Sequence, residues 1–481
     1  MDSAALSGFI CEGTQAFYRG KPAIGSTVED MSESIHNEEV SRGVDRIFPG
    51  VVETLKELVA IPSVSAPAFD QSTLLVSARR IVELLAEAGI PNSRIIQTAH
   101  SRPAIIGHRH VSDDAPTVVL YAHHDVQPVG ETAAWDTDPF VATQIGDRLF
   151  GRGAADDKAG IVAHLGALRA LGDDLPVNVT VFMEGEEEVG SPAMPEILDE
   201  IRHDLAADVF VVADSSNWKV GVPSLTTSLR GLVSLDVTVR VLRHAVHSGM
   251  YGGPVLDALT LLSRLIATLH DERGNIAVAG LSHSSDPRVD MPESDLRADA
   301  AVLDGVELAG SGSLTSRLWT KPAISVIGID APSVAHSSNT LIPAATARIS
   351  VRIAPGQTPD AAEAALRAHF ASNAPFGASV EVVRAENSGR PFLVDGAAPA
   401  MGVARTAFAQ AWGTEPVDIG IGGSIPLVAD LNELFPDATI LVTGVEDPDS
   451  RAHGANESVH LGELRKVVEA EALLLLGLAG R

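Results

Sequence analysis

The sequence predicts an α/β protein built on a mostly parallel sheet, with a smaller α+β domain inserted into it. Short β-branched runs at 117–121, 177–182 and 209–212 alternate with helical stretches, which is the order expected for buried parallel strands connected by helices. Acidic residues and histidines follow directly after these runs. From about residue 231 the pattern changes to strand, helix, strand, helix, strand, and near residue 395 the first pattern resumes.

The individual elements follow this plan along the chain. In the first part, apolar residues at helical spacing predict helices at 49–59, 70–88 and about 158–171, placed around the three strands. In the inserted part we expect strands at 232–241, 346–353 and 378–383, and helices at 256–270 and 359–370. The last part contains a helix at 398–412, an apolar strand at 439–442 and a closing helix at 461–476.

These patterns divide the chain into four segments. Residues 1–45 mix glycine, serine and acidic residues without sustained periodicity, so we expect an N-terminal extension and assign it no function. Residues 46–230 and 395–481 form the two parts of a discontinuous main domain, and residues 231–394 form the inserted domain. The sequence contains no internal repeat and no low-complexity tract.

The composition limits the possible partners. The 481 residues include 63 Asp and Glu against 35 Lys and Arg, a net charge of −28, so a nucleic acid would be repelled. Cys11 is the one cysteine, so no intrachain disulfide can form and any metal site must use His, Asp and Glu. The apolar run at 472–480 is far shorter than the roughly 20 residues of a membrane span, and the N-terminus lacks a signal-peptide pattern. We therefore expect a soluble, cytoplasmic protein that binds neither nucleic acid nor membrane.

Two motifs lie where ligands bind in such a sheet, beyond the carboxyl ends of its strands. His123 and Asp125 follow the first strand, and this pair can supply a metal ligand together with the carboxylate that orients it. An ordinary loop is the alternative. The glycine-rich turn at 151–160 contains Asp156 and Asp157, which either bind a ligand or cap the following helix, and it lacks the spacing of a phosphate-binding loop.

A third motif places four glutamates within the five positions 184–188, at the end of a strand. Crowded carboxylates raise one another's proton affinity unless a cation compensates, although a solvated acidic loop is the usual explanation of such a run. Asp214 after the next strand and His453 near the C-terminus are uninformative alone. Histidines and carboxylates at successive strand ends, however, together fit a two-metal hydrolytic centre.

The order and the residue sequences of these segments resemble those of the dinuclear zinc metallopeptidase family that includes carnosine dipeptidases, glutamate carboxypeptidases, aminoacylases and succinyl-diaminopimelate desuccinylases. The chain is most similar to the dipeptidase branch, and the resemblance covers about 51–476. It implies a zinc-exopeptidase-like catalytic domain whose insert serves as lid and dimerisation domain. Five motifs in family order carry it: Tyr-Ala-His-His-Asp-Val-Gln-Pro at 121–128, Gly-Arg-Gly-Ala-Ala-Asp-Asp-Lys at 151–158, Glu-Gly-Glu-Glu-Glu-Val-Gly-Ser at 184–191, His-Ser-Gly-Met-Tyr-Gly-Gly at 247–253, and His453.

The resemblance also implies a ligand set for two divalent metal ions per subunit, zinc by preference, with manganese or cobalt as alternatives. His123 and Asp214 would bind one ion, and Glu188 and His453 the other. Asp156 would bridge the two ions.

Further roles carry over from the same family. Asp125 would orient the histidine ligand, and Glu187 would act as the general base that activates water and then protonates the leaving amine. His247 of the partner subunit would stabilise the oxyanion, which implies a homodimer. Asn339 and Arg352 would hold the free C-terminal carboxylate of a small peptide substrate.

A glycine-rich turn is also expected to contact the substrate, through Gly423 and Ser424. Here the chain departs from the family pattern. Carnosine-type dipeptidases carry Arg-Glu before this turn, whereas this chain has Gly420 and Ile421. The missing charges leave open how a substrate amine would be recognised.

The sequence therefore predicts metal-dependent hydrolysis of dipeptides or short peptides with a free C-terminal carboxylate. An alternative is an amidohydrolase that deacylates N-acyl or N-succinyl amino acids, because it needs the same metals and carboxylate clamp but no free amine. An alternative of another class is a catalytically inactive binding or assembly protein, since a fold alone does not establish activity. The presence of every expected ligand argues against this last alternative.

Overall fold

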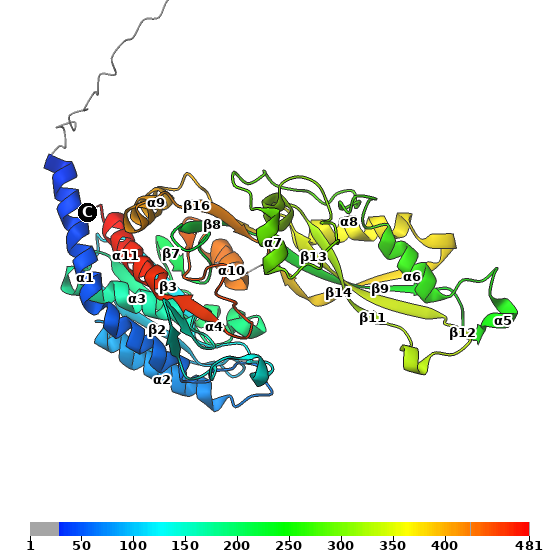
Figure 1. Cartoon of the computed structure of the whole chain (residues 1–481), viewed down its shortest axis with the longest axis horizontal. Coiled ribbons are helices and arrows are strands. Elements are labelled where there is room, and N and C mark those ends of the chain that lie inside the picture. Colours follow the sequence, from blue (N-terminus) through cyan, green and yellow to red (C-terminus); the bar gives the residue numbers. More distant parts are fainter. Residues whose placement is uncertain (1–27, 424, 481) are drawn as a thin grey trace, which may run out of the picture.

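The molecule consists of a main domain and an inserted domain that projects from it along the long axis (Figure 1). The computed structural model describes residues 28–423 and 425–480. The segments before and after the insert join in one domain, because the last long strand of the chain pairs with strands of the first part. Within the described ranges, no helix is both long and apolar enough to cross a membrane.

A nine-stranded sheet forms the centre of the main domain. Its middle strands β6, β3, β7 and β17 run parallel, which confirms the predicted parallel centre of the sheet. Toward the edges the pairing becomes antiparallel, with β2 and β1 beyond β6 and with β8 beyond β17, except that β16 pairs with β8 in parallel. The strands are β1 (Arg94–Ile96), β2 (Ala104–Arg109), β3 (Thr117–His123), β6 (Asn178–Glu184), β7 (Val209–Val212), β8 (Ser224–Leu229), β15 (Phe392–Leu393), β16 (Val417–Ile421) and β17 (Thr439–Val442).

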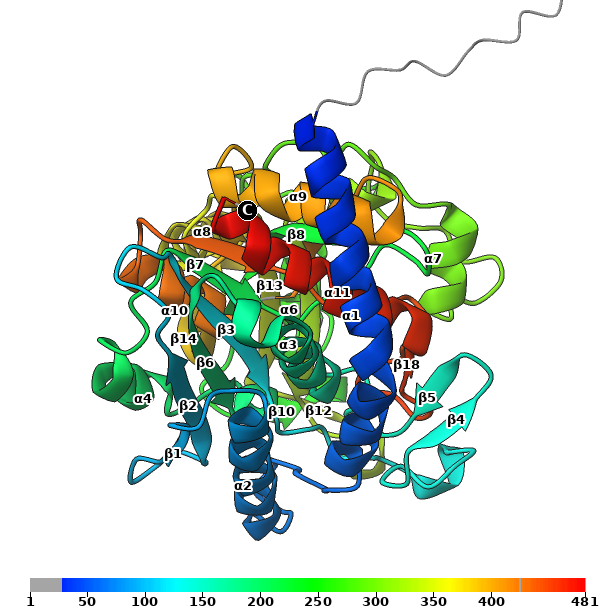
Figure 2. The ribbon, with the colours of Figure 1, turned by 90° about the vertical axis from the view of Figure 1, so that its left-hand side faces the viewer.

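Both faces of this sheet are buried, which is why its strands read as continuous apolar runs. In β3, Val118 and Leu120 belong to one core, and Val119 and Tyr121 belong to the core on the opposite face. The first core is covered by α1 (Val28–Val59), α2 (Ser72–Glu87), α3 (Lys158–Leu171), α9 (Pro399–Trp412) and α11 (Leu461–Leu478), of which α1, α3 and α11 lie side by side (Figure 2). The second core is covered by α4 (Met194–Ile201) and α10 (Pro426–Leu434).

Helix α1 corrects the expected N-terminal boundary. It begins at Val28 and continues through residue 45, and Val40 and Val44 are already buried in the main core. These two valines and Leu55 lie at multiples of about one helical turn, so one apolar stripe runs through the helix. The acidic residues between 29 and 39 obscure this stripe in the sequence. The main domain therefore begins before residue 46.

The inserted domain is an antiparallel sheet with two helices on one face. The sheet order is β11-β13-β9-β14, and α6 and α8 pack on it to form a separate core. The order of the three expected strands and two expected helices is the observed one, whereas β11 and the short elements β10, α5, α7 and β12 were not expected. The elements are β9 (Gly231–Arg240), β10 (Val246–His247), α5 (Ser248–Tyr251), α6 (Ala258–Ala267), α7 (Glu293–Asp299), β11 (Ala323–Asp330), β12 (Thr340–Leu341), β13 (Ala344–Ile353), α8 (Pro359–Ser372) and β14 (Ser379–Gly389).

A small three-stranded sheet lies beside the main one, in the order β18-β5-β4, with β4 (Thr143–Ile145), β5 (Arg148–Phe150) and β18 (Ser458–His460). Its strands pair segments that are more than 300 residues apart. Short single-turn helices occur at Thr132–Ala134, Gly172–Asp174, Glu187–Val189, Ser316–Thr320, Val334–His336 and Pro375–Gly377.

Candidate metal centre

The parallel strands of the main sheet end together, and this brings distant acidic residues and histidines to one place. His123 is the last residue of β3 and pairs with Glu184, the last residue of β6. Tyr121 pairs with Val212, the last residue of β7, so Asp214 follows two positions later. Because parallel strands share their carboxyl-terminal edge, all three segments deliver their polar residues to the same crevice.

Two groups of metal-ligand atoms lie in this crevice and share one residue. In the first group, His123 Nε2 is 3.0 Å from Asp156 Oδ1 and 3.9 Å from Asp214 Oδ1. In the second, His453 Nε2 is 2.9 Å from Asp156 Oδ2 and 3.1 Å from Glu188 Oε2. In each group the ligand atoms all lie within 4.8 Å of one another. The two oxygens of Asp156 therefore face different groups, which is the arrangement of a carboxylate that bridges two cations.

Backbone and side-chain hydrogen bonds orient these ligands. The ring Nδ1 of His123 lies 3.1 Å from the carbonyl oxygen of Asp125, which leaves Nε2 facing the carboxylates. The Asp125 carboxylate accepts the backbone N–H groups of Glu187 and Glu188, at 3.2 and 3.1 Å. Gln127 donates from its backbone and its side chain to the Glu188 carboxylate, at 3.0 and 2.8 Å. The strand end 123–127 thus fixes the acidic turn at 187–188.

The turn that contains Asp156 is held from the C-terminal segment. The buried Glu457 carboxylate accepts the backbone N–H groups of Ala155 and Asp156, at 3.0 and 3.1 Å. Its other oxygen accepts from Arg152 Nη1 at 2.6 Å. The next aspartate, Asp157, caps α3 by accepting from Gly160 N. The two adjacent aspartates therefore do different things, since one caps the helix and the other faces the ligand groups.

Carboxylates outnumber histidines among the candidate ligands in the crevice. Hydrogen bonds that His453 donates to Asp156 and Glu188 raise its pKa to about 11. Burial would lower the pKa of His123, but hydrogen bonds to Asp125 and Asp156 hold it well above its usual value. Burial and the charge on Asp156 raise the pKa of Asp214 to about 6. Divalent cations relieve such crowding, and the nitrogen and oxygen donors suit zinc, manganese or cobalt.

Glu187 lies beside this centre without joining either ligand group. It begins the single turn Glu187–Val189, and its backbone is held by Asp125. Burial and the charge on Asp214 raise the pKa of Glu187 well above its usual value. Its side chain accepts no hydrogen bond from the described residues. A carboxylate in this position is able to take and return a proton.

A known protein family matches most of the chain. Residues 119–477 match the model of peptidase family M20/M25/M40. The chain belongs to this family. It is a metallopeptidase, and its relatives include named dipeptidases, which confirms the resemblance inferred from the motifs.

Curated relatives and solved structures align with this peptidase over nearly its full length. It is 34% identical to a cysteinylglycine-S-conjugate dipeptidase of Corynebacterium striatum, over 93% of this chain and 98% of the relative. It is 28% identical to human Beta-Ala-His dipeptidase, over 88% and 89% of the two chains. The structure of the dipeptidase Dug1p from Saccharomyces cerevisiae has the same fold, with a TM-score of 0.74 at 21% identity, and covers 92% of this chain and 99% of its own.

The predicted substrate residues of this M20-family chain fall into two separate places. Arg352 lies near the end of β13 at the domain junction, paired with Leu232 and Ala323. Asn339 lies instead beside His247, because its carbonyl accepts from Ser248 N at 2.9 Å. Asn339 and His247 belong to the end of the inserted domain farthest from the main domain, where Figure 1 shows α5 and β12.

The glycine-rich turn lies at the domain junction. Gly423 is half-buried, and Ser424 lies outside the described residues. Arg230, which the sequence analysis missed, donates from Nε to the carbonyl of Gly422 at 3.1 Å. Its charge and that of Arg352 act on each other, and burial lowers the pKa of Arg230 to about 10. The one sequence signal for Arg230 is its position at the expected start of the insert.

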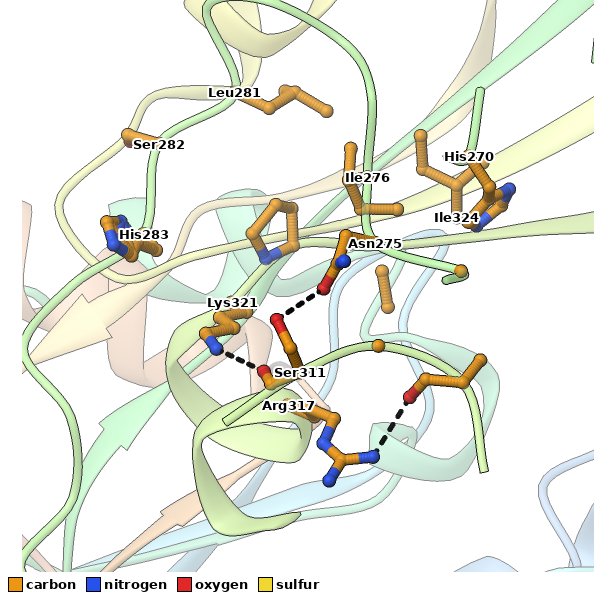
Figure 3. A pocket seen from close by; sticks show the side chains of 15 residues that line it. His270, Asn275, Ile276, Leu281, Ser282, His283, Ser311, Arg317, Lys321 and Ile324 are labelled. Carbon is orange, nitrogen blue, oxygen red and sulfur yellow. Dashed lines mark hydrogen bonds between the residues drawn. The ribbon is translucent and has the colours of Figure 1, made fainter. Parts of the chain in front are cut away.

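A cavity of about 400 Å³ lies in the inserted domain, in the segment between α6 and β11 (Figure 3). On its wall Lys321 donates to the carbonyl of Ser311, and Arg317 donates to that of Ala309. The carbonyls of Arg317 and Lys321 in turn accept from Arg230 Nη1. This segment therefore supports Arg230 at the junction, and none of the predicted site residues lines the cavity.

The residues that support the ligands were not predicted from the sequence. Arg152 and Gln127 lie within the quoted motifs, and Glu457 lies four positions after His453, but nothing in their spacing shows which of them would meet. The contact between Arg152 and Glu457 depends on the pairing of β18 with β5, two three-residue strands without a sequence signal.

Proposed function

We propose that this peptidase hydrolyses dipeptides with a free C-terminal carboxylate by using two divalent metal ions, zinc by preference. His123 and Asp214 hold one ion, Glu188 and His453 hold the other, and Asp156 bridges them. The observation that supports this proposal is the position of Asp156, whose two oxygens lie 3.0 and 2.9 Å from the two histidines. The single cysteine of the chain suits a cytoplasmic enzyme.

The two ions, when bound, would polarise the substrate carbonyl and lower the pKa of the attacking water to near neutral. Glu187 takes the proton of the attacking water and returns it to the nitrogen of the leaving amino acid. Its backbone N–H is held by the Asp125 carboxylate, and the backbone carbonyl of Asp125 lies at hydrogen-bond distance from Nδ1 of the histidine ligand. A carboxylate fixed through its backbone but free in its side chain can move between these two proton-transfer positions.

Arg352 binds the substrate carboxylate. Its guanidinium is half-buried, and burial lowers its pKa because no carboxylate among the described residues balances it. A bidentate pair with a planar carboxylate would supply that balance. Arg230 adds a second positive charge beside it. Relatives of this chain are named for Cys-Gly and Beta-Ala-His, and we place its substrates among such small dipeptides.

His247 acts on the active site of a second copy of the chain. It is exposed at the far end of the inserted domain, which in this structure is turned away from the metal ligands of its own chain. Its Nδ1 accepts the backbone N–H of Gly249 at 3.0 Å, so the proton of a neutral ring lies on Nε2 and is available to an oxyanion. The exposed Met250 and Tyr251 beside it offer apolar area for contact with another subunit.

The substrate class is tested on protein loaded with two equivalents of zinc, with metal content measured in the same preparation. Free Cys-Gly, Beta-Ala-His and Ala-Gly should be cleaved, C-terminally amidated Ala-Gly should be cleaved poorly, and N-acetyl amino acids should be resistant. Arg352→Lys should raise KM for Ala-Gly more than it changes kcat, because a point charge replaces a fork. Arg348→Lys is the matched control, since Arg348 lies on the same strand but pairs with Asp236 on the exposed face. Equal cleavage of free and amidated Ala-Gly would contradict the proposal that Arg352 binds the substrate carboxylate.

The role of His247 is tested by mixing two inactive variants. His247→Ala should bind metals and lose roughly two to three powers of ten in turnover, the scale of one oxyanion donor. When it is mixed with Glu187→Gln and the subunits exchange, heterodimers with one intact site should restore activity. His244→Ala, three residues away and also exposed, should keep full activity and serve as control. If exchange is verified by labelled subunits and activity stays absent, His247 does not act in trans.

A further inference from the structure

The five candidate ligands differ in how firmly their side chains are packed. In four of them the side chain is between 1% and 17% exposed, whereas that of His453 is 58% exposed. His123 is also oriented through its second ring nitrogen, which lies 3.1 Å from the carbonyl oxygen of Asp125. Among the described residues, no group forms a hydrogen bond with Nδ1 of His453. Metal-binding histidines are commonly oriented by such a second hydrogen bond, so His453 has to be positioned in another way.

The backbone of the loop that carries His453 has an uncommon conformation. Arg451, His453 and Asn456 have φ angles of 55°, 63° and 63°, in the left-handed region that residues other than glycine rarely adopt. Such conformations persist where surrounding contacts impose them. The position of His453 Nε2, 2.9 Å from Asp156 and 3.1 Å from Glu188, therefore depends on the contacts that hold this loop.

The side chain of Asn456 ties the loop to the segment 134–136. Its Oδ1 accepts the backbone N–H of Asp136 at 2.8 Å. Its Nδ2 donates to the Asp136 carboxylate at 3.0 Å and to the carbonyl of Ala134 at 3.3 Å. One amide thus uses its acceptor and both of its donor hydrogens on a single short segment, which fixes its orientation.

The segment 134–136 is itself anchored in the main domain. Trp135, between the two contacted residues, is buried, and its Nε1 donates to the carbonyl of Val129 at 2.9 Å. The Arg152 guanidinium lies 5.5 Å from the Trp135 ring and also donates to the carbonyl of Gly454 at 3.1 Å. The loop is therefore held to one platform at two positions, one and three residues after the histidine.

We propose that Asn456 is a positioning residue for the second metal ion, the one held by Glu188 and His453. By tying the left-handed turn to the segment 134–136, its amide keeps the exposed imidazole where Nε2 faces Asp156 and Glu188. The proposal rests on the proposed function and adds to it a residue that determines how tightly the second ion binds. Asn456 acts through His453 and takes no part in the reaction itself.

The test measures the binding of each zinc ion separately. Zinc-loaded protein is titrated with a competing chelator, which gives one Kd for each of the two ions. Asn456→Ala should raise the Kd of one ion by about 10- to 100-fold, the usual effect of losing a residue that orients a metal ligand, and should leave the other within about threefold. The retained ion also shows that the centre remains folded. Asn373→Ala is the matched control, because it removes an exposed asparagine whose Nδ2 donates to the carbonyl of His369, and it should change neither Kd.

A double-mutant cycle shows whether Asn456 acts through His453. His453→Ala should raise the Kd of the same ion by a larger factor than Asn456→Ala does. Adding Asn456→Ala to His453→Ala should then change that Kd by no more than about twofold, whereas a residue that only supports the fold would cause its full additional loss. Asn456→Gly adopts a φ of 63° without strain but lacks the amide, so it should resemble Asn456→Ala.

Four results would overturn the proposal. These are an equal weakening of both ions in Asn456→Ala, no change for either ion, a full additional loss in the double variant, and zinc binding like that of the wild type in Asn456→Gly. If the unmutated protein bound fewer than two zinc ions, the proposed function itself would be overturned.

Discussion

Replacing Arg152 by methionine should destabilise the main domain strongly, and the loss should grow with pH. The Arg152 and Glu457 side chains are 1% and 0% exposed and meet at 2.6 Å. Methionine keeps most of the side-chain volume but leaves the Glu457 carboxylate buried without its cation. Removing one partner of such a pair costs about 3–5 kcal/mol of unfolding free energy. Loss of the contact between the guanidinium and the Trp135 ring, 5.5 Å apart, adds about 1 kcal/mol.

The pH dependence follows from the ionisation of Glu457. In the native protein burial already raises the pKa of Glu457 to about 6, above the 4.5 of the free side chain, even though Arg152 acts in the opposite direction. A carboxyl group whose folded pKa is raised contributes stability that is fully present below about pH 4.5 and is lost as pH rises through the folded value. Without Arg152 the folded pKa of Glu457 rises further. The destabilisation should therefore be larger at pH 8 than at pH 5.

The assay is urea unfolding at a fixed free zinc concentration, because metal binding shifts stability by mass action. It is followed for the wild type, Arg152→Met, Glu457→Gln and the double variant at pH 5, 6.5 and 8. The double variant should recover a large part of the loss and should lack the additional pH dependence that Arg152→Met introduces, since the unpaired Glu457 charge is gone. If Arg152→Met unfolds like the wild type at pH 8, or if the double variant is less stable than the single one there, the argument from a buried unpaired carboxylate fails.

Three further outcomes are expected. Glu187→Gln should retain two zinc ions by metal analysis and lose several orders of magnitude in kcat, and near-normal turnover would refute its role as base. Asp156→Ala should lose both zinc occupancy and activity, whereas two bound ions would show that another carboxylate bridges. Lys158 is buried, donates to the carbonyls of Leu58 and Ile61, and has a pKa lowered by burial to about 7. Between pH 7 and 10 the lysine is still protonated in the unfolded chain but not in the folded one, so the stability of the wild type should rise with pH over this range. Lys158→Met should flatten that rise, and an unchanged slope would count against it.

Much of the fold could be predicted because the main sheet is buried on both faces. A strand such as β3 must then be apolar at every position, so its run is visible in the sequence and its polar end is visible too. The bounds expected for β7 and β17 coincide with the observed ones for this reason. Strands at the edge carry a weaker signal. β8 and β16 mix serine, threonine and glycine with apolar residues, and neither was expected.

Buried strands that are visible as apolar runs account for only some of the candidate ligands at the centre. His123 and Asp214 follow neighbouring buried strands, so the parallel register alone brings them together. His453 follows no such strand. Its group forms because Ser458 of β18 pairs with Phe150 of β5, directly before the turn that contains Asp156.

The position of His453 shows why spacing alone could not have completed the site. Three-residue strands have no periodicity to detect, and the contact between residues 300 positions apart is fixed by side chains that themselves depend on the fold. Gly151 N donates to the carbonyl of Glu457, and the Glu457 carboxylate accepts from the backbone of Asp156. One buried glutamate thus ties the C-terminal segment to the bridging aspartate through hydrogen bonds to the backbone. A supporting residue such as Glu457 can be identified only from its hydrogen bonds in the folded chain, whereas a metal ligand can be suspected from its side-chain type alone.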